Sequence, residues 1–290
     1  MKSIHRISNR LQDLDIRGAR MLSVWLPRLI LPLPRGPLIW PVIYGFSLKI
    51  DPRGDNGTEQ SLYYHGAYER GTLDVLGKLL RRGDHFVDIG ANIGLMSVFA
   101  ARIVGPGGTV SAFEPHPLTV EMLRENIVLN ALSNIEVYQA AAGSTEGVCA
   151  IADGPEGNRG ASYTVPAGSE QGLHTAAVVR ADEVLKNKPL PDAVKIDAEG
   201  DETEALEGME GIFRKARPAI IVESSREAGE SGPDHTSRIF DMLTARGYRI
   251  FRGQKGKGVP SPLLKVENAA DMPNHDNVYG LTAAHLERLR

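Results

Sequence analysis

The sequence predicts an α/β fold built on a doubly wound, mostly parallel sheet of seven strands, with a β-rich insert and an N-terminal helical extension. Two observations predict this fold class. Short apolar runs alternate with helix-like runs from about residue 66 to the C-terminus, which is typical of βαβ units. In addition, a glycine-spaced turn, "DIGANIG" from Asp88 to Gly94, joins the first apolar run to a helix.

The alternation assigns each element in turn. Helices are expected at residues 71–81, 93–104, 118–130, 203–213 and 237–246. Strands are expected at residues 86–89, 108–115, 134–141, 192–200, 218–225, 248–252 and 276–282. Between Val148 and Arg180 the alternation lapses into short β-like pieces, which predict an inserted hairpin or meander. The polar segment 226–235 follows the carboxyl end of a strand, where a lid is expected.

The N-terminal part departs from this alternation. Ile4, Ile7, Leu11 and Leu14 recur at spacings of three and four, which indicates an amphipathic helix with arginines on its polar side. Residues 21–46 are apolar and aromatic, but five prolines and two arginines interrupt them, so a transmembrane helix is not expected. Two interpretations stay open for residues 1–46: packing against the core, and peripheral contact with a membrane surface. We therefore separate an extension, residues 1–50, from a main domain, residues 51–290.

Charge and cysteine content limit the partners and the compartment. Residues 1–50 hold eight Lys or Arg and two Asp, a net charge of +6, so the other 240 residues carry −9 of the total of −3. An acidic main domain argues against a nucleic-acid substrate, because phosphate contacts dominate that affinity. The single cysteine, Cys149, and the missing signal-peptide pattern indicate a cytoplasmic protein. The basic extension suggests a peripheral location at the inner membrane face; the sequence gives no oligomeric state.

The turn and the acidic residue after the next strand together indicate a nucleoside-containing cofactor. Gly90 and Gly94 allow close approach of the backbone, and Glu114 ends the next strand, where a carboxylate suits ribose hydroxyls. A dinucleotide site would need G-x-G-x-x-G, whereas Asn92 occupies the position of the middle glycine. S-adenosylmethionine fits better, because it has no phosphate and its cationic groups suit Asp88. The alternative reading makes Asp88 a helix cap and Glu114 a surface residue.

Five blocks of sequence carry a resemblance to a known family: "GAYERGTLDVL", "FVDIGANIGLMSVFAA", "AFEPHP", "VKIDAEGDETEALEGM" and "IIVES". Together they resemble the FkbM-type methyltransferases over roughly residues 63–224. The resemblance implies a class I, Rossmann-like fold and S-adenosylmethionine-dependent methylation of hydroxyl groups, often of sugars or polyketides. It also implies that the cofactor is lined by Glu69, Asp88, Gly90, Asn92, Gly94 and Glu114. His116, next to Glu114, is expected near the ribose.

Three carboxylates are candidates for the chemistry. Asp197, Glu199 and Glu223 follow the fourth and fifth strands, so the sheet should bring them to one edge beside the cofactor. Two explanations stay open: Asp197 or Glu199 is a general base for an alcohol, or Asp197 and Glu223 hold a divalent cation such as Mg²⁺. A structural role is also open for Glu199, as a cap of the following helix, and for Asp197, as a turn residue.

The expected function is therefore transfer of a methyl group to a hydroxyl of a sugar, glycolipid or related glycosylated metabolite. The alternative is an S-adenosylmethionine-binding scaffold protein without catalysis. A dehydrogenase is disfavoured because the middle glycine is missing. The identity of the acceptor is expected to depend on the insert at Val148 to Arg180 and on the loop after Glu223.

Overall fold

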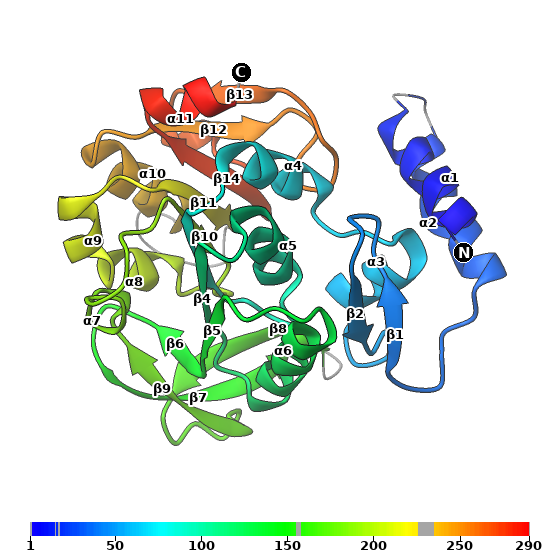
Figure 1. Cartoon of the computed structure of the whole chain (residues 1–290), viewed down its shortest axis with the longest axis horizontal. Helices are drawn as coiled ribbons and strands as arrows, with labels where there is room; N and C mark the ends of the chain where they lie inside the picture. Colours follow the sequence, from blue (N-terminus) through cyan, green and yellow to red (C-terminus); the bar gives the residue numbers. More distant parts are fainter. Residues whose placement is uncertain (1, 15, 17, 155–157, 226–234, 290) are drawn as a thin grey trace.

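The centre of the protein is a mixed β-sheet (Figure 1). The computed structural model describes all residues except 1, 15, 17, 155–157, 226–234 and 290. Within the described residues this sheet has eight strands in the order β13-β12-β14-β11-β10-β3-β4-β5. In chain order the strands are β3 (His85–Ile89), β4 (Thr109–Phe113), β5 (Ile135–Tyr138), β10 (Ala193–Ile196), β11 (Ala219–Ser224), β12 (Arg249–Gly253), β13 (Leu263–Val266) and β14 (Asp276–Leu281).

Strand direction and order confirm the doubly wound fold, with one strand more than expected. Strands β5, β4, β3, β10 and β11 are parallel, and β14 is antiparallel to both of its neighbours, β11 and β12. The additional strand, β13, pairs with β12 at the edge of the sheet. Its short run follows Pro260 and Pro262, and prolines so close to a short apolar run favour a loop assignment from sequence.

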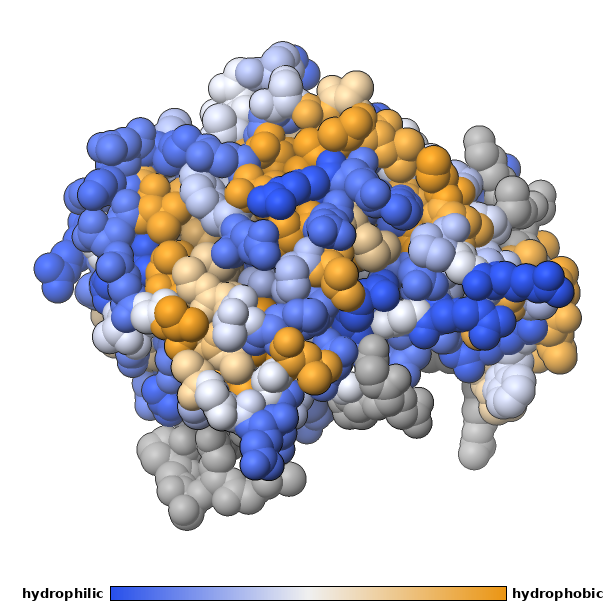
Figure 2. All heavy atoms as spheres, turned by 90° about the horizontal axis from the view of Figure 1, so that it is seen from below, coloured by the Kyte–Doolittle hydropathy of each residue, from blue (hydrophilic) through white to orange (hydrophobic). Residues whose placement is uncertain are grey.

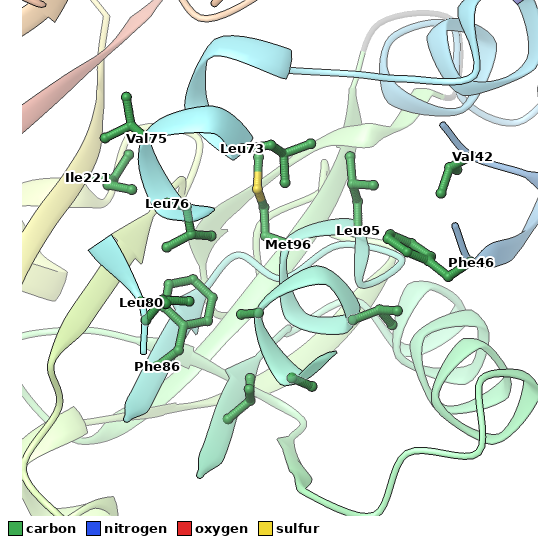
Figure 3. Close-up of a cluster of buried hydrophobic side chains, with 14 of the residues drawn as sticks. Val42, Phe46, Leu73, Val75, Leu76, Leu80, Phe86, Leu95, Met96 and Ile221 are labelled. Carbon is green, nitrogen blue, oxygen red and sulfur yellow. The ribbon is translucent and has the colours of Figure 1, made fainter. Parts of the chain in front are cut away.

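Helices cover both faces of the sheet. One face carries α4 (Arg70–Leu79), α5 (Leu95–Val104) and α11 (Ala283–Arg288), and in Figure 3 Leu73 and Leu76 lie close to Met96 of α5. The other face carries α7 (Ala181–Val184), α8 (Glu202–Glu207), α9 (Glu210–Lys215) and α10 (His235–Ala245). The single helix expected at residues 203–213 is therefore two helices. Gly208 separates them: its carbonyl accepts a hydrogen bond from Asp182 N, and a Cβ there would lie 2.2 Å from the Gly143 carbonyl oxygen.

The expected β-rich insert is a second sheet. Its strands are β6 (Ala140–Ala142), β7 (Gly147–Gly154), β8 (Asn158–Pro166) and β9 (His174–Val179), in the order β6-β9-β7-β8. Strand β6 follows β5 after one residue, so this sheet begins where the central sheet ends. The lid expected at residues 226–235 falls almost entirely outside the described residues.

The N-terminal extension contains a β-hairpin as well as helices. Helices α1 (Lys2–Asp13) and α2 (Ala19–Ile30) precede β1 (Leu38–Pro41), β2 (Ser47–Ile50) and α3 (Thr58–His65), and they lie at one end of the molecule (Figure 1). Leu48 and Ile50 are fully buried in the main core. Asn126 of α6 (Pro117–Leu129) accepts a hydrogen bond from Lys49 N at 2.6 Å. The hairpin is thus attached to the main domain, while α1 and α2 lie beyond it.

Helix α1 is amphipathic, as its spacing indicates, but the side chains it buries against the protein include polar ones, and the apolar Ile7 is exposed. His5, Ser8 and Asn9 are buried, whereas Ile7 and Leu14 are about half exposed. His5 Nε2 and Asn9 Nδ2 bond to the backbone oxygens of Tyr63 and His65 in α3, whereas Asn9 Oδ1 is buried without a hydrogen-bond partner in the described part of the chain. Among the described residues no helix is both long and apolar enough to span a bilayer.

Candidate active site

A pocket opens at the carboxyl edge of the central sheet, where β3, β4, β10 and β11 end. Strand β8 of the second sheet and the residues just before α4 complete its walls. The sheet topology explains this position, because parallel strands bring the residues after them to the same edge. Apart from Gly94, every site residue expected from the sequence lines it: Glu69, Asp88, Gly90, Asn92, Glu114, His116, Asp197, Glu199 and Glu223.

Glycines fix the turn between β3 and α5. Gly90, Asn92 and Gly94 all have positive φ values, of 75°, 50° and 92°. A Cβ on Gly90 would lie 1.7 Å from the carbonyl oxygen of Asp197, so only glycine lets this turn approach the loop after β10. A Cβ on Gly94 would lie 2.4 Å from Leu123 Cδ1. Gly94 therefore makes room for helix α6 and does not face the pocket.

Asp88 presents an unpaired carboxylate oxygen at the base of this turn. Ser97 Oγ donates a 2.6 Å hydrogen bond to Asp88 Oδ2. Asp88 Oδ1 is buried and has no hydrogen-bond partner in the described part of the chain. Burial raises the pKa of Asp88 to about 6, although the nearby Lys195 opposes the shift. An unpaired buried acceptor is costly unless a ligand supplies a donor, so this atom indicates a binding site for a cationic or N–H group.

Glu114 is held by backbone amides beside the turn. Asn92 N donates to its Oε2 at 2.8 Å and His116 N donates to its Oε1 at 2.9 Å. Burial raises the pKa of Glu114 to about 7. His116 caps α6 through Nδ1, and its Nε2 lies 3.2 Å from Asp153 Oδ1. Both ring nitrogens of His116 have protein partners, which favours a positioning role over proton transfer.

Two lysines neutralise the carboxylates at the floor of the pocket. Lys195 Nζ donates to Asp197 Oδ2 at 2.6 Å. Burial alone would raise the pKa of Asp197, but the Lys195 ammonium outweighs it and holds that pKa below its usual range. Lys257 Nζ lies 2.8 Å from Glu223 Oε1 and 3.1 Å from Glu69 Oε1.

Glu223 differs from its neighbour Asp197 in the direction of its pKa shift. Burial and the adjacent Asp197 charge raise the pKa of Glu223, whereas the Lys257 ammonium, 2.8 Å from Glu223 Oε1, opposes the shift. A hydrogen bond joins the Asp197 and Glu223 carboxyl groups. A carboxylate that is both ion-paired and hydrogen-bonded is a weak proton acceptor, so Asp197 is poorly suited to be a base.

Glu199 lies on the loop between β10 and α8 and is the exposed member of the three carboxylates. It adopts a left-handed conformation, φ 49°, is exposed to solvent and lines the pocket. Surrounding protein and the charges of Asp197 and Glu202 raise its pKa to about 7. Glu202, which the sequence reading missed, fixes the loop: its Oε1 accepts from Ala198 N at 2.9 Å and Gly200 N at 3.2 Å. The N-cap of α8 is Asp201 and no side-chain cap hydrogen bond is made there, so the capping role considered for Glu199 is not seen.

The residues do not fit the magnesium site considered for Asp197 and Glu223. Each of these carboxylates already has a lysine ammonium as its partner, at 2.6 Å and 2.8 Å. A divalent cation needs several oxygen ligands without such cations beside them. Within the described residues, no group of three or more His, Cys, Asp or Glu side chains could hold a metal ion. The magnesium interpretation is therefore not supported.

Sequence reasoning missed the cationic residues and the wall formed by the insert. Lys195 offers a signal, because a lysine stands inside the otherwise apolar strand Ala193–Ile196. Lys257 offers no such sequence signal. It lies in the loop between β12 and β13, and only the folded chain brings it to Glu69 and Glu223. Strand β8 contributes the other missed residues of the lining, namely Arg159, Gly160, Ser162, Tyr163 and Thr164.

The fold and this pocket define a class of site: a pocket at the carboxyl edge of a Rossmann-like sheet. Residues 88–250 match the Methyltransferase FkbM domain, which is more than half of the chain. The chain belongs to the FkbM methyltransferase family.

The chain is also similar to several named proteins. The chain is 30% identical over 157 residues to the hexuronic acid methyltransferase AglP of Haloferax volcanii, covering 52% of this chain and 62% of AglP, less than two thirds of its length. It is 29% identical over 208 residues to the 31-O-demethyl-FK506 methyltransferase FkbM of Streptomyces tacrolimicus, covering 61% and 77%. A crystal structure of an FkbM methyltransferase from Methylobacillus flagellatus aligns with a TM-score of 0.46 and 18% identity, covering 97% of this chain and 58% of that one.

The pocket suits S-adenosylmethionine in two independent ways. The buried, unpaired Asp88 Oδ1 offers an acceptor to a cationic group, and Glu114 is held in place at the end of β4, where ribose hydroxyls are bound in this class of sheet. Ala140, Ala141, Ala142, Phe113 and Ile151 add an apolar part to the lining. Adenine recognition through apolar contact and backbone groups, expected because "QAAAGS" lacks an acidic residue, remains a prediction.

Proposed function

We propose that this chain transfers a methyl group to a hydroxyl of a sugar or a related glycosylated metabolite, with Glu199 as the general base. The observation that carries the proposal is the contrast between the carboxylates at the sheet edge. Asp197 and Glu223 are paired with lysines, whereas Glu199 is exposed, lines the pocket and has its pKa raised to about 7. A base whose pKa lies near neutral pH is efficient at that pH.

The residues of this chain then have separate roles. Bound S-adenosylmethionine would supply an electrophilic methyl group on a sulfonium. Asp88 and Glu114 would hold its cationic and ribose groups, and the acceptor hydroxyl would lose its proton to the Glu199 carboxylate as its oxygen forms the new C–O bond. The departing C–S electron pair stays on the sulfur. Glu202 acts indirectly, by fixing the loop that carries Glu199.

The acceptor would lie against strand β8. This strand brings Arg159, Ser162, Tyr163 and Thr164 to the pocket, and hydroxyl and guanidinium groups of this kind suit a polyhydroxylated ligand. AglP is named as a hexuronic acid methyltransferase and FkbM as a 31-O-demethyl-FK506 methyltransferase, and these two names support a hydroxyl of a sugar or related compound as the acceptor. A glycolipid acceptor belongs to the same proposal.

Methyl transfer to a panel of glycosides and uronic acids tests the proposal, with the product identified by mass spectrometry. We expect the wild-type protein to methylate at least one acceptor, and Glu199→Gln to lose about 100-fold or more of kcat, the usual contribution of a general base. Calorimetry should show unchanged S-adenosylmethionine affinity in this variant, because Glu199 does not hold the cofactor. Full activity of Glu199→Gln would remove Glu199 from the mechanism.

A non-catalytic scaffold that binds the cofactor is the second candidate. It would bind S-adenosylmethionine with no methylated product across the panel, and Glu199→Gln would change nothing. The loop strain at Glu199 (φ 49°) argues against it, because a left-handed non-glycine residue costs about 1 kcal/mol or more and is typical of functional sites.

A further inference from the structure

We infer that the outer face of α1 and α2 binds an anionic membrane surface. We call this face the α2 surface, defined by Met21, Leu22, Val24, Trp25 and Leu29 of α2 together with Ile7 of α1. This inference does not depend on the identity of the methyl acceptor.

Helices α1 and α2 bury polar side chains and expose large apolar ones, which is the reverse of the usual arrangement in a water-soluble protein. In α1 the buried residues His5, Ser8 and Asn9 are polar. In α2 the buried residues include Ala19 and Ser23, and Ser8 Oγ donates a 3.0 Å hydrogen bond to Ser23 O between the helices. A helix that packs on a protein core normally places its large apolar residues inward, so this arrangement leaves them without a partner.

The large apolar side chains of α2 form one exposed stripe. Met21, Trp25 and Leu29 follow each other at i, i+4 and i+8, with 63%, 59% and 78% of their surface exposed. Leu22 and Val24 flank this stripe and are also exposed. Figure 2 shows apolar and hydrophilic residues side by side at the end of the molecule that carries these helices. A contiguous apolar patch of this kind marks an interaction site.

Charge selects a membrane over a second copy of the chain. Residues 1–50 carry a net charge of +6 against −9 for the rest, and the arginines of this part include the exposed Arg6, Arg10, Arg28 and Arg35. Two copies of such a surface would repel each other, whereas anionic lipid headgroups would attract it. Basic residues beside an apolar stripe that contains tryptophan are typical of helices that lie in a membrane interface.

Vesicle binding tests this inference directly. The full chain is mixed with phosphatidylcholine vesicles with and without phosphatidylglycerol, and the bound fraction is measured by co-sedimentation. We expect binding to the anionic vesicles that weakens at high salt. The protein has two tryptophans, and Trp40 is buried, so a blue shift of the emission on binding would report on Trp25.

A matched pair of variants separates the α2 surface from exposed apolar residues in general. Leu29 of α2 and Val128 of α6 are 78% and 79% exposed. Leu29→Glu should lower the vesicle partition coefficient by roughly tenfold, because it removes a leucine that would insert into the membrane and adds a charge that anionic lipid repels, whereas Val128→Glu should leave it unchanged. Arg6→Glu with Arg10→Glu should abolish the preference for anionic lipid.

Three results would overturn the inference. The first is a wild-type protein that stays in the supernatant with anionic vesicles at low salt. The second is an equal loss of binding in Leu29→Glu and Val128→Glu. The third is a dimer, seen by light scattering without lipid and abolished by Leu29→Glu, which would assign the surface to a second copy of the chain.

Discussion

The ammonium group of Lys195 lies 2.6 Å from Asp197 Oδ2, and both side chains line the floor of the pocket. This ion pair gives Asp197 a different role from the other two carboxylates at the sheet edge, Glu199 and Glu223. Asp197 is paired with Lys195, Glu223 is paired with Lys257, and Glu199 is the carboxylate that we propose accepts a proton. The carboxylates therefore differ in chemistry although they lie at one edge.

Breaking the Lys195 pair should destabilise the protein. Asp197→Asn would leave the almost fully buried Lys195 ammonium without its partner, so we expect a loss of about 2–4 kcal/mol in the free energy of unfolding. Denaturant unfolding measures this loss. The exposed pair of Lys186 and Glu183 is the control, and Glu183→Gln should cost less than about 0.5 kcal/mol. Equal effects of the two variants would contradict the structural role given to Lys195.

Activity should depend on the ionisation of Glu199. A general base must be deprotonated, and its pKa is raised to about 7. We therefore expect kcat/KM to be level above pH 7 and to fall about tenfold per pH unit below it. The measurement is a pH profile of kcat/KM on the best acceptor. In Glu199→Gln this acidic limb should vanish from the residual activity; a limb that persists unchanged in the variant would assign it to another group.

Chelation of divalent cations should not reduce activity. Lys195 and Lys257 already neutralise Asp197 and Glu223, so these carboxylates gain nothing from a bound cation. We expect the same initial rate, within about twofold, after treatment with EDTA and after addition of magnesium. A loss of activity with EDTA that magnesium restores would require a metal site and would contradict this reading of the network.

Position 90 should accept only glycine, because the backbone there lies against the Asp197 carbonyl oxygen. A Cβ there would lie 1.7 Å from the Asp197 carbonyl oxygen, whereas a Cβ on Gly83 would meet no atom within 4 Å. Both glycines have positive φ, 75° and 90°, so Gly83→Ala measures the backbone cost alone, about 1 kcal/mol. Gly90→Ala should cost about 3 kcal/mol or more in denaturant unfolding and should abolish cofactor binding. Similar costs for the two variants would show that the approach is not required.

Much of the fold can be predicted from the sequence, because its signals are local. Alternating strands and helices identify the sheet, and the rule that parallel strands end at one edge brings Asp88, Glu114, Asp197 and Glu223 together. Lys257 cannot be found this way, since it reaches Glu223 only through the loop that connects β12 to the edge strand β13. The contribution of β8 to the pocket wall cannot be predicted from local sequence either, because it depends on how the second sheet packs against the central sheet.

The N-terminal helices show the limit of periodicity. The spacing of Ile4, Ile7 and Leu11 correctly indicates a helix, but it does not say which face meets the protein. That choice depends on α3, whose Tyr63 and His65 carbonyls accept hydrogen bonds from His5 and Asn9. Polar partners in a distant segment therefore bury the side of α1 that carries His5 and Asn9, and Ile7 is left exposed. The division into residues 1–50 and 51–290 stays a prediction.

Calorimetric titration with S-adenosylmethionine tests the central claim most directly, because it needs no acceptor. We expect micromolar binding to the wild-type protein and to Glu199→Gln, and no measurable binding to Glu114→Ala, which removes the carboxylate that Asn92 N and His116 N hold beside the turn. Thermal unfolding of Glu114→Ala would verify that the variant is folded. No heat with the wild-type protein, or undiminished binding by a folded Glu114→Ala, would contradict the cofactor site described for this pocket.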